Sequence, residues 1–566
     1  MINNRINTLI SKFKKYNIDG YVIPKNDEFF SEYSANDRLK TISNFSGSAG
    51  YSIILKKKNY LFVDGRYTIQ AKKEAGKNFQ IIDSHKIINC NLFKNLSIGF
   101  DPKFFTSIQI KKFFDKNNKV KSIEKNLIDQ INLRQVKPNK PFFSLNNKVV
   151  GENYKTKIKK IRNYLNKNRS DYLFITAPEN VAWLLNIRGH DNPNSPIPNC
   201  HLIIDNKNSF YLITYKNKVS RLITEKKLKS NQIIEPKNFN KFILNLKGKK
   251  IIIDRNTCSI FFENLIKKKF KILKKEDPIY LLKSLKNKIE IKNMLKSHIF
   301  DGVALTKFIH WIKNINKKKI TEFEAQNKLE NFRKKNKEYL YPSFNTIAGT
   351  GGNGAIVHYR ATKKNTKKID KKDIFLCDSG GQYKYGTTDV TRTICFSKPK
   401  KNIKNIFTRV LKGHIAVVKS DLDKYSSGNL IDIRARKFLK EINLDYQHGT
   451  GHGVGFFLNV HEGPQGISKL NKIKLLEGMI LSNEPGYYRK DKFGIRIENL
   501  IYVKRNKNKL YFDNLTLAPI DKDLINFDLL SDDEKSYLWK YNLDIYTKLH
   551  KYLNSSEKRW LATFIQ

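Results

Sequence analysis

The stretch from Leu376 to Thr393, LCDSGGQYKYGTTDVTRT, holds two aspartates in surroundings where a solvated charge is not expected. Asp378 ends an apolar run that begins at Ile374, so its carboxylate is predicted to lie at the mouth of a buried strand. Asp389 follows eleven residues later in a β-rich stretch, and that separation allows a tight hairpin that sets the two carboxylates side by side. Unpaired carboxylates on neighbouring strands repel each other, and one or two divalent cations relieve that cost.

More histidine and acidic residues follow in Gly-rich or strand-like settings. His448 and His452 stand in HGTGHGVG, where the glycines let the backbone and the imidazoles approach a common centre closely. His461 lies in NVHEGP, Glu484 in SNEPGYY and Glu498 in GIRIEN. The spacing does not fit the helical HExxH zinc motif. Two Asp, two Glu and one His form an oxygen-rich pair of sites, which favours ions such as manganese over structural zinc.

The first half of the chain holds two segments with the same predicted order of elements. A chain of 566 residues exceeds what one hydrophobic core serves, so we expect two or three domains. The predicted elements are a helix at 6–16 with strands at 21–24, 51–55 and 60–63, then a helix at 158–165 with strands at 172–175, 201–204 and 210–214 and a further helix from Pro178. The shared order predicts a duplicated α/β domain.

Polar stretches suggest where the domains are joined. The sequence VKPNKP at 136–141 is the linker candidate in the first half, and a second boundary falls near Lys286. The elements predicted beyond Lys286 are a long helix at 290–315, a helix opened by the capping box TEFE at 321–324, a block of short strands and Gly-rich turns at 341–503, and a helical tail from Ser531. The candidate catalytic and metal-binding residues lie in this block of short strands.

Composition argues for a folded protein with an unusual charge. Hydrophobic residues make up 40% and aromatics 12%, which excludes a disordered chain. The net charge of +56 suggests a polyanionic partner such as nucleic acid, but the lysines are spread along the whole chain with many Asn and Ile, so we favour a bias in codon usage. Five widely spaced cysteines without a CxxC pattern predict reduced, buried thiols. No stretch is predicted to cross a membrane, and we expect a cytoplasmic protein.

Taken together, these motifs resemble the pita-bread metallopeptidases, and among them the three-domain Xaa-Pro aminopeptidases. The resemblance includes PSF at 342–344, NGAIVHY at 353–359 and, in the first half, SEY at 31–33, FSGSAG at 45–50 and VDGRY at 63–67. It implies an α/β (α+β) chain with two creatinase-like N-terminal α/β domains followed by a pita-bread catalytic domain. The implied bounds are 1–140, 141–285 and 286–510, with a helical C-terminal extension at 511–566.

The resemblance also implies a metal site. Asp378 would bind one ion, Asp389 and Glu498 would bridge both ions, and His452 and Glu484 would complete the second site. The cofactors implied are two divalent ions, foremost Mn²⁺, with Co²⁺ or Zn²⁺ as alternatives. Structural ion pairs are the other interpretation of these carboxylates, and the lack of matched Lys or Arg nearby in the sequence disfavours it.

The remaining catalytic roles follow from the same resemblance. His448 and His461 would line the scissile bond, and His358 would bind substrate or shuttle a proton, although each histidine taken alone has a structural interpretation too. Glu484 would manage the proton of the attacking water, and Arg496 would orient the ligands. The implied reaction is hydrolysis of the bond before a penultimate proline by metal-activated water, in a homodimer.

Two other functions stay open. A prolidase shares the metal site but accepts only dipeptides, and the long two-segment first half favours the aminopeptidase. A non-catalytic relative that binds other proteins or nucleic acid belongs to a different class, and the presence of all five ligands disfavours it. Methionine aminopeptidase and metal-free creatinase-like hydrolysis are less favoured. Nucleic acid is therefore not expected as a partner despite the positive charge. The expected partners are peptides whose second residue is proline.

Overall fold

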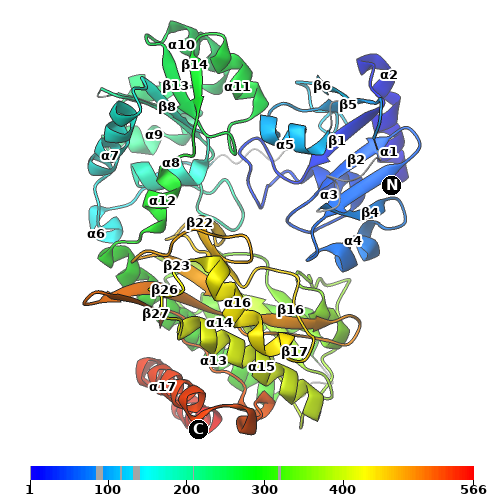
Figure 1. Ribbon diagram of the computed structural model, residues 1–566, viewed down its shortest axis with the longest axis vertical. Helices are drawn as coiled ribbons and strands as arrows, with labels where there is room; N and C mark the ends of the chain where they lie inside the picture. Colours follow the sequence, from blue (N-terminus) through cyan, green and yellow to red (C-terminus); the bar gives the residue numbers. More distant parts are fainter. Residues whose placement is uncertain (1, 85–92, 115–117, 132–139, 208, 316–319) are drawn as a thin grey trace. The chain divides into compact units, whose positions relative to one another are not determined.

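The computed structural model describes residues 2–84, 93–114, 118–131, 140–207, 209–315 and 320–566 (Figure 1). The chain forms two compact units, Met1–Ile279 and Tyr280–Gln566. Most of the linker candidate at 136–141 lies outside the described residues, so the structure does not test it.

The first unit begins with a six-stranded sheet in the order β4-β3-β2-β1-β5-β6. Its central strand β1 (Gly20–Pro24) is antiparallel to β2 (Tyr51–Leu55) and parallel to β5 (Ser97–Phe100). The other strands are β3 (Asn59–Val63), β4 (Gln80–Asp83) and β6 (Lys119–Ser122), and the helices around them are α1 (Ile2–Ser11), α2 (Phe13–Tyr16), α3 (Arg38–Ser43), α4 (Thr68–Ala75) and α5 (Ser107–Phe113). The strands predicted at 21–24, 51–55 and 60–63 are confirmed.

A second sheet in the same unit repeats this pattern, in the order β12-β11-β10-β8-β13-β14. Its central strand β8 (Tyr172–Ile175) is antiparallel to β10 (His201–Asp205) and parallel to β13 (Lys250–Ile253). The other strands are β11 (Phe210–Ile213), β12 (Ile233–Ile234) and β14 (Lys271–Lys274), and the helices include α7 (Tyr154–Lys167), α8 (Pro178–Leu185), α10 (Phe239–Asn245) and α11 (Ile260–Lys267). Strand order and direction match those of the first sheet throughout, as the predicted duplication requires.

The second unit combines several small sheets with long helices (Figure 1). Its sheets have the orders β16-β17-β20, β15-β18-β19, β22-β21-β23-β26-β27 and β24-β25. Among these strands are β15 (Tyr339–Pro342), β16 (Ile347–Thr350), β23 (Ile480–Asn483), β24 (Gly486–Arg489) and β27 (Lys509–Asn514). The helices are α13 (Lys288–Asn314), α14 (Glu322–Lys334), α15 (Lys401–Val418), α16 (Gly428–Lys440), α17 (Asp532–Leu549) and α18 (Ser555–Ile565). The predicted capping box is confirmed, since Thr321 and Glu324 cap each other's backbone at the start of α14. Apolar side chains of α15 and α17 pack with those of β25 (Phe493–Arg496) in one core.

The two aspartates of the opening stretch lie at adjacent strands, but not in a hairpin. Strand β17 (Phe375–Ser379) pairs antiparallel with β20 (Val390–Ile394), so that Asp378 is opposite Thr391. The predicted tight hairpin is wrong, because the intervening residues form β18 (Gly381–Tyr383) and β19 (Gly386–Thr387), which pair with each other in another sheet. Gly380 permits this departure, since a Cβ there would lie 2.0 Å from the carbonyl oxygen of Thr388.

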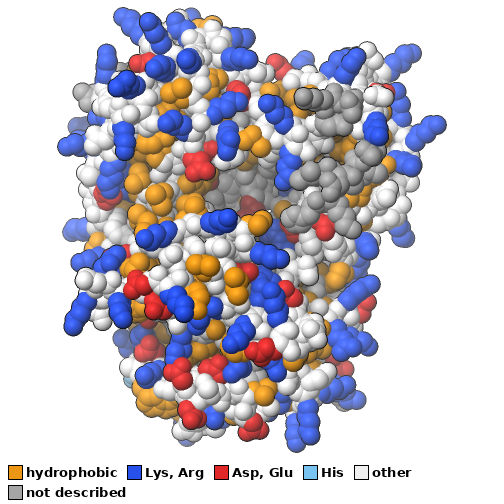
Figure 2. Space-filling model, in the orientation of Figure 1, with side chains coloured by type: hydrophobic (Ala, Val, Ile, Leu, Met, Phe, Trp, Pro, Cys, Tyr) orange, Lys and Arg blue, Asp and Glu red, His pale blue; other side chains and the backbone are white. Residues whose placement is uncertain are grey.

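Surface and thiol features agree with the sequence. Figure 2 shows Lys and Arg side chains scattered over the whole visible face, not gathered on one element. The four cysteines in the described residues (200, 258, 377 and 395) are buried and form no disulfide with one another, as predicted, and Cys90 lies outside these residues. No helix in the described part of the chain has both the length and the apolar character needed to cross a bilayer.

Candidate metal centre

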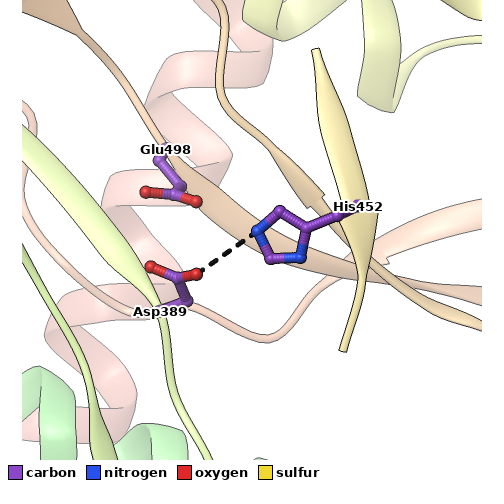
Figure 3. Close-up of side chains that lie close together, drawn as sticks. All are labelled: Asp389, His452 and Glu498. Carbon is purple, nitrogen blue, oxygen red and sulfur yellow. Dashed lines mark ion pairs between the residues drawn. The ribbon is translucent and has the colours of Figure 1, made fainter. Parts of the chain in front are cut away.

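Three of the five predicted ligands converge in the second unit. Asp389 directly precedes β20, His452 lies in β21 (Gly451–Gly453), and Glu498 lies between β25 and β26 (Asn499–Asn506). One ligand atom from each of the three residues lies within 4.8 Å of the others, and Figure 3 shows the side chains pointing toward one another. The dashed line in that figure joins Asp389 Oδ2 to His452 Nε2, 3.5 Å apart. The sheets thus bring residues from three separate sequence motifs to one point.

The other two predicted ligands flank this cluster in different ways. Glu484 places Oε1 3.5 Å from His452 Nε2 and accepts a hydrogen bond from Ser482 Oγ at 3.1 Å. Asp378 Oδ2 accepts a hydrogen bond from Arg496 Nη2 at 2.6 Å, so an arginine does pair with one of the carboxylates, contrary to the expectation from the sequence. The other oxygen of Asp378, Oδ1, is buried and has no hydrogen-bond donor among the described residues.

Burial and mutual repulsion dominate the electrostatics of the cluster. Burial, with the charges of Asp389 and Glu484, raises the pKa of Asp378 to about 7 although Arg496 lowers it. Burial and the neighbouring acids also raise the pKa of Glu498 well above its ordinary value. Burial lowers the pKa of His452, but its hydrogen bond with Asp389 and the charge of Glu484 outweigh that and raise the pKa to about 9. Protein groups alone do not neutralise this site, and a divalent cation relieves the same repulsion.

The donor set fits metal ions on two counts. The carboxylates and the imidazole are the ligand types that borderline divalent ions bind. The orphaned Oδ1 of Asp378 is a buried acceptor of the kind that rarely goes without a partner in native proteins. The chemistry of the residues and their spacing therefore agree with metal binding.

The predicted catalytic histidines differ in how closely they approach the cluster. The ring of His461 lies 4.3 Å from that of His452, measured between centroids. His448 is 8% exposed, and its Nε2 lies 2.8 Å from the hydroxyl of Tyr488. His358 is half-buried in the turn that follows the short helix η6 (Gly351–Ala355), and its role stays a prediction.

Two side chains that the sequence did not single out organise the site. Thr391 Oγ1 donates to Glu498 Oε2 at 2.7 Å and accepts from Arg496 Nε at 3.0 Å. The hydroxyl of Tyr488 accepts from Arg496 Nη1 at 2.6 Å and contacts His448. Thr391 and Tyr488 both lie within the sequence motifs that carry the predicted ligands. That position is the only feature of the sequence from which their role could have been predicted.

Models of known protein families match nearly the whole chain. Residues 292–505 match the model of metallopeptidase family M24, and residues 508–565 match the C-terminal region of that peptidase. Residues 5–131 and 133–290 each match a creatinase/prolidase N-terminal domain. The chain is 35% identical to a probable Xaa-Pro aminopeptidase P of Laccaria bicolor, over 98% of this chain and 92% of that protein. It is 34% identical to Xaa-Pro aminopeptidase 1 of Dictyostelium discoideum, over 100% of this chain and 96% of the relative.

The chain belongs to the Xaa-Pro aminopeptidases of metallopeptidase family M24. This family membership confirms the resemblance, the predicted fold class and the assignment as a metallopeptidase. Among solved structures, an X-prolyl aminopeptidase from Caenorhabditis elegans, described as a cytosolic enzyme with a di-nuclear active site, superposes with a TM-score of 0.92 at 27% identity, covering 100% of this chain and 99% of that one. The prolidase from Pyrococcus furiosus, also 27% identical, gives a TM-score of 0.51 and covers 98% of its own chain but 63% of this Xaa-Pro aminopeptidase family member.

Proposed function

We propose that this protein removes the N-terminal residue from peptides whose second residue is proline, using two divalent metal ions. The observation that carries the proposal is the convergence of Asp389, His452 and Glu498, with one ligand atom of each within 4.8 Å of the others. The names of the full-length relatives support the same substrate class.

The five ligands divide between the ions as follows. Asp378 would help to hold one ion and His452 with Glu484 the other, while Asp389 and Glu498 would contribute to both. Mn²⁺ is our first choice because the set is rich in oxygen, with Co²⁺ and Zn²⁺ as alternatives. When bound, the ions supply an activated water and offset the charge that develops on the carbonyl oxygen.

The protein's own groups then handle protons and orientation. Glu484 would accept the proton of the attacking water, and burial raises the pKa of this carboxyl, as a general base requires. His461, whose ring lies 4.3 Å from that of His452, donates a hydrogen bond to the carbonyl oxygen as it gains charge. His448 assists the leaving nitrogen, and His358 binds the substrate.

The assembly around the site is part of the same proposal. We divide the chain at 1–140, 141–285, 286–510 and 511–566, and we propose a cytoplasmic homodimer, in line with the cytosolic C. elegans enzyme. The aminopeptidase is favoured over prolidase because 98% of the P. furiosus prolidase aligns with only 63% of this chain. The remainder of this chain has no counterpart in that prolidase.

Hydrolysis of three peptides tests the proposal. Arg-Pro-Pro, Arg-Pro and Arg-Ala-Ala are incubated with metal-stripped protein, and then with Mn²⁺, Co²⁺ or Zn²⁺ restored. Metal-dependent release of Arg from Arg-Pro-Pro but not from Arg-Ala-Ala is the expected result. Cleavage of Arg-Pro alone would replace the aminopeptidase with a prolidase, and no turnover with any of the metals would contradict the enzyme assignment.

A further inference from the structure

Arg392 is a buried cation that contacts the backbone of the candidate metal ligand Glu498. It lies in β20 and is 3% exposed, and its five N–H groups contact six acceptors, all of them uncharged oxygens, with one hydrogen of Nη2 shared between two of them. Nη1 donates to the carbonyl oxygens of Glu498 at 2.7 Å and Thr391 at 2.8 Å. Nε donates to the carbonyl of Pro519, and Nη2 donates to Ala518 O, Asn499 Oδ1 and the Tyr541 hydroxyl.

These contacts hold the backbone on both sides of a bridging ligand. The amide of Glu498 donates to the carbonyl of Thr391 at 3.2 Å, and Thr391 Oγ1 donates to the Glu498 carboxylate at 2.7 Å. Arg392 binds the two carbonyls of this same pair. Any shift of the guanidinium therefore moves the backbone that sets the direction of the Glu498 carboxylate.

Tyr541 connects this network to the C-terminal region. It lies in α17, inside the segment 508–565 that matches the C-terminal region of the family, and is 4% exposed. Its hydroxyl accepts from Arg392 Nη2 at 3.0 Å and donates to the carbonyl of Ala518 at 2.9 Å. The hydroxyl thus fixes both the guanidinium and one of the acceptors that the guanidinium uses.

We propose that Tyr541 is a positioning residue for the metal ligand Glu498, acting through Arg392, so that the C-terminal region is part of the metal centre. The inference rests on the proposed function for the role of Glu498 as a ligand. Groups that orient a ligand from behind typically change metal affinity 10–100-fold when they are removed. The substitution Tyr541→Phe removes the hydroxyl alone and keeps the ring in its core.

The same helix provides a matched control. Tyr537 lies one turn before Tyr541, with the rings stacked at 6.4 Å and 6°. Its hydroxyl accepts from Asn514 Nδ2 at 2.9 Å, whereas the side-chain hydrogen bonds of Arg392 described above end on other groups. Asn514 is in turn hydrogen-bonded to Asn499 at 3.1 Å, so Tyr537 reaches Arg392 only through two intervening side chains. Tyr537→Phe therefore removes a partly buried hydroxyl of the same helix without removing a direct partner of Arg392.

The experiment measures metal binding and not only turnover. Binding of Mn²⁺ to the stripped full-length protein is followed through the electron paramagnetic resonance signal of the free ion, and the visible spectrum of bound Co²⁺ reports ligand geometry. We expect Tyr541→Phe to weaken Mn²⁺ binding about 10-fold or more and to change the Co²⁺ spectrum. Tyr537→Phe should stay within about twofold of the wild type. Arg392→Lys keeps the positive charge but loses the planar set of guanidinium N–H donors, so this variant should bind Mn²⁺ more weakly still.

Two results overturn the inference: Tyr541→Phe matching the wild type in affinity and spectrum, or Tyr537→Phe losing as much affinity. A thermal scan of each metal-free variant verifies that it is folded before binding is compared. Failure of the proposed function looks different, since the wild type would then bind the ions and release no Arg from Arg-Pro-Pro. A wild type that binds no ion would refute both.

Discussion

A buried three-residue bridge next to the site allows a quantitative test of how the second unit is held together. Glu462, the first residue of β22 (Glu462–Ile467), directly follows His461 in the chain. One carboxylate oxygen pairs closely with Lys286 Nζ, and the other lies 3.2 Å from Lys283 Nζ. The side chains of all three residues are 1–2% exposed. Burial lowers the pKa of Lys286, and the negative charge of Glu462 opposes that shift.

Removing the carboxylate and removing one lysine should lower the free energy of unfolding by different amounts. Glu462→Gln leaves two buried ammonium groups without an opposite charge, and breaking a buried pair in this way costs about 3–5 kcal/mol. Lys286→Met leaves Glu462 still paired with Lys283, so we expect a loss of only about 1 kcal/mol. For a unit of this size 1 kcal/mol corresponds to roughly 2–4 °C in Tm. Glu462→Gln should therefore lower Tm by roughly 6–20 °C, and Lys286→Met by roughly 2–4 °C.

Differential scanning calorimetry of the full chain measures these shifts. The transition of the second unit is the one that rises when Mn²⁺ is added, because only folded protein provides the proposed site. Glu477→Gln is the control, since its pair with Arg505 is about half exposed (46% and 55%) and should contribute less than about 1 kcal/mol. If Lys286→Met destabilises as much as Glu462→Gln, the reasoning from unbalanced buried charge is wrong.

Three more outcomes follow from the structure. Burial lowers the pKa of His201 to about 4, below the 6.5 of the unfolded chain, so the free energy of unfolding should fall as the pH drops from 6.5 toward 4. In urea titrations at several pH values, the unfolding free energy of His201→Leu should fall less steeply with pH than that of the wild type. An equal dependence on pH would contradict this role of His201. Glu484→Gln should lower kcat on Arg-Pro-Pro at least 100-fold, as measured by release of Arg, whereas near-normal turnover would remove its role as a base. A Cβ at Gly451 would lie 1.9 Å from the carbonyl oxygen of Ser482, so Gly451→Ala should cost about 1–3 kcal/mol and weaken Mn²⁺ binding; a wild-type Tm would refute this.

Local sequence patterns were enough to predict the elements and the doubled first half. Apolar runs marked the strands at 51–55 and 60–63, and the helix predicted at 158–165 lies within α7. Repeated order then implied repeated topology, which the matching pairings of β1 and β8 bear out. Such signals suffice because each element is formed by residues that are neighbours in the chain.

The contacts inside the site could not be predicted in the same way. The hairpin between Asp378 and Asp389 was wrong because the intervening glycines allow the chain to leave for another sheet, and the spacing alone does not record that choice. The pairing of Asp378 with Arg496 and the hydrogen bond from Thr391 to Glu498 join residues more than 100 positions apart. No local periodicity encodes such partners, although each one stands in a motif that carries a ligand.

Arg392 and Arg496, two buried arginines at this site, show how the fold tolerates a cluster of buried acids while leaving ligand atoms accessible. Arg496 pairs directly with Asp378 but contacts only Oδ2, and Oδ1 remains without a protein donor in the described part of the chain. Arg392 binds backbone carbonyls behind Glu498 and takes neither of its carboxylate oxygens. A cation placed behind the backbone offsets negative charge without occupying a ligand position, which a carboxylate–arginine pair cannot do. Three of the acceptors that hold Arg392 lie in the segments that carry the ligands, on Thr391, Glu498 and Asn499. The other three, on Pro519, Ala518 and Tyr541, come from the C-terminal region, so that region helps to hold a cation that leaves the ligand atoms free.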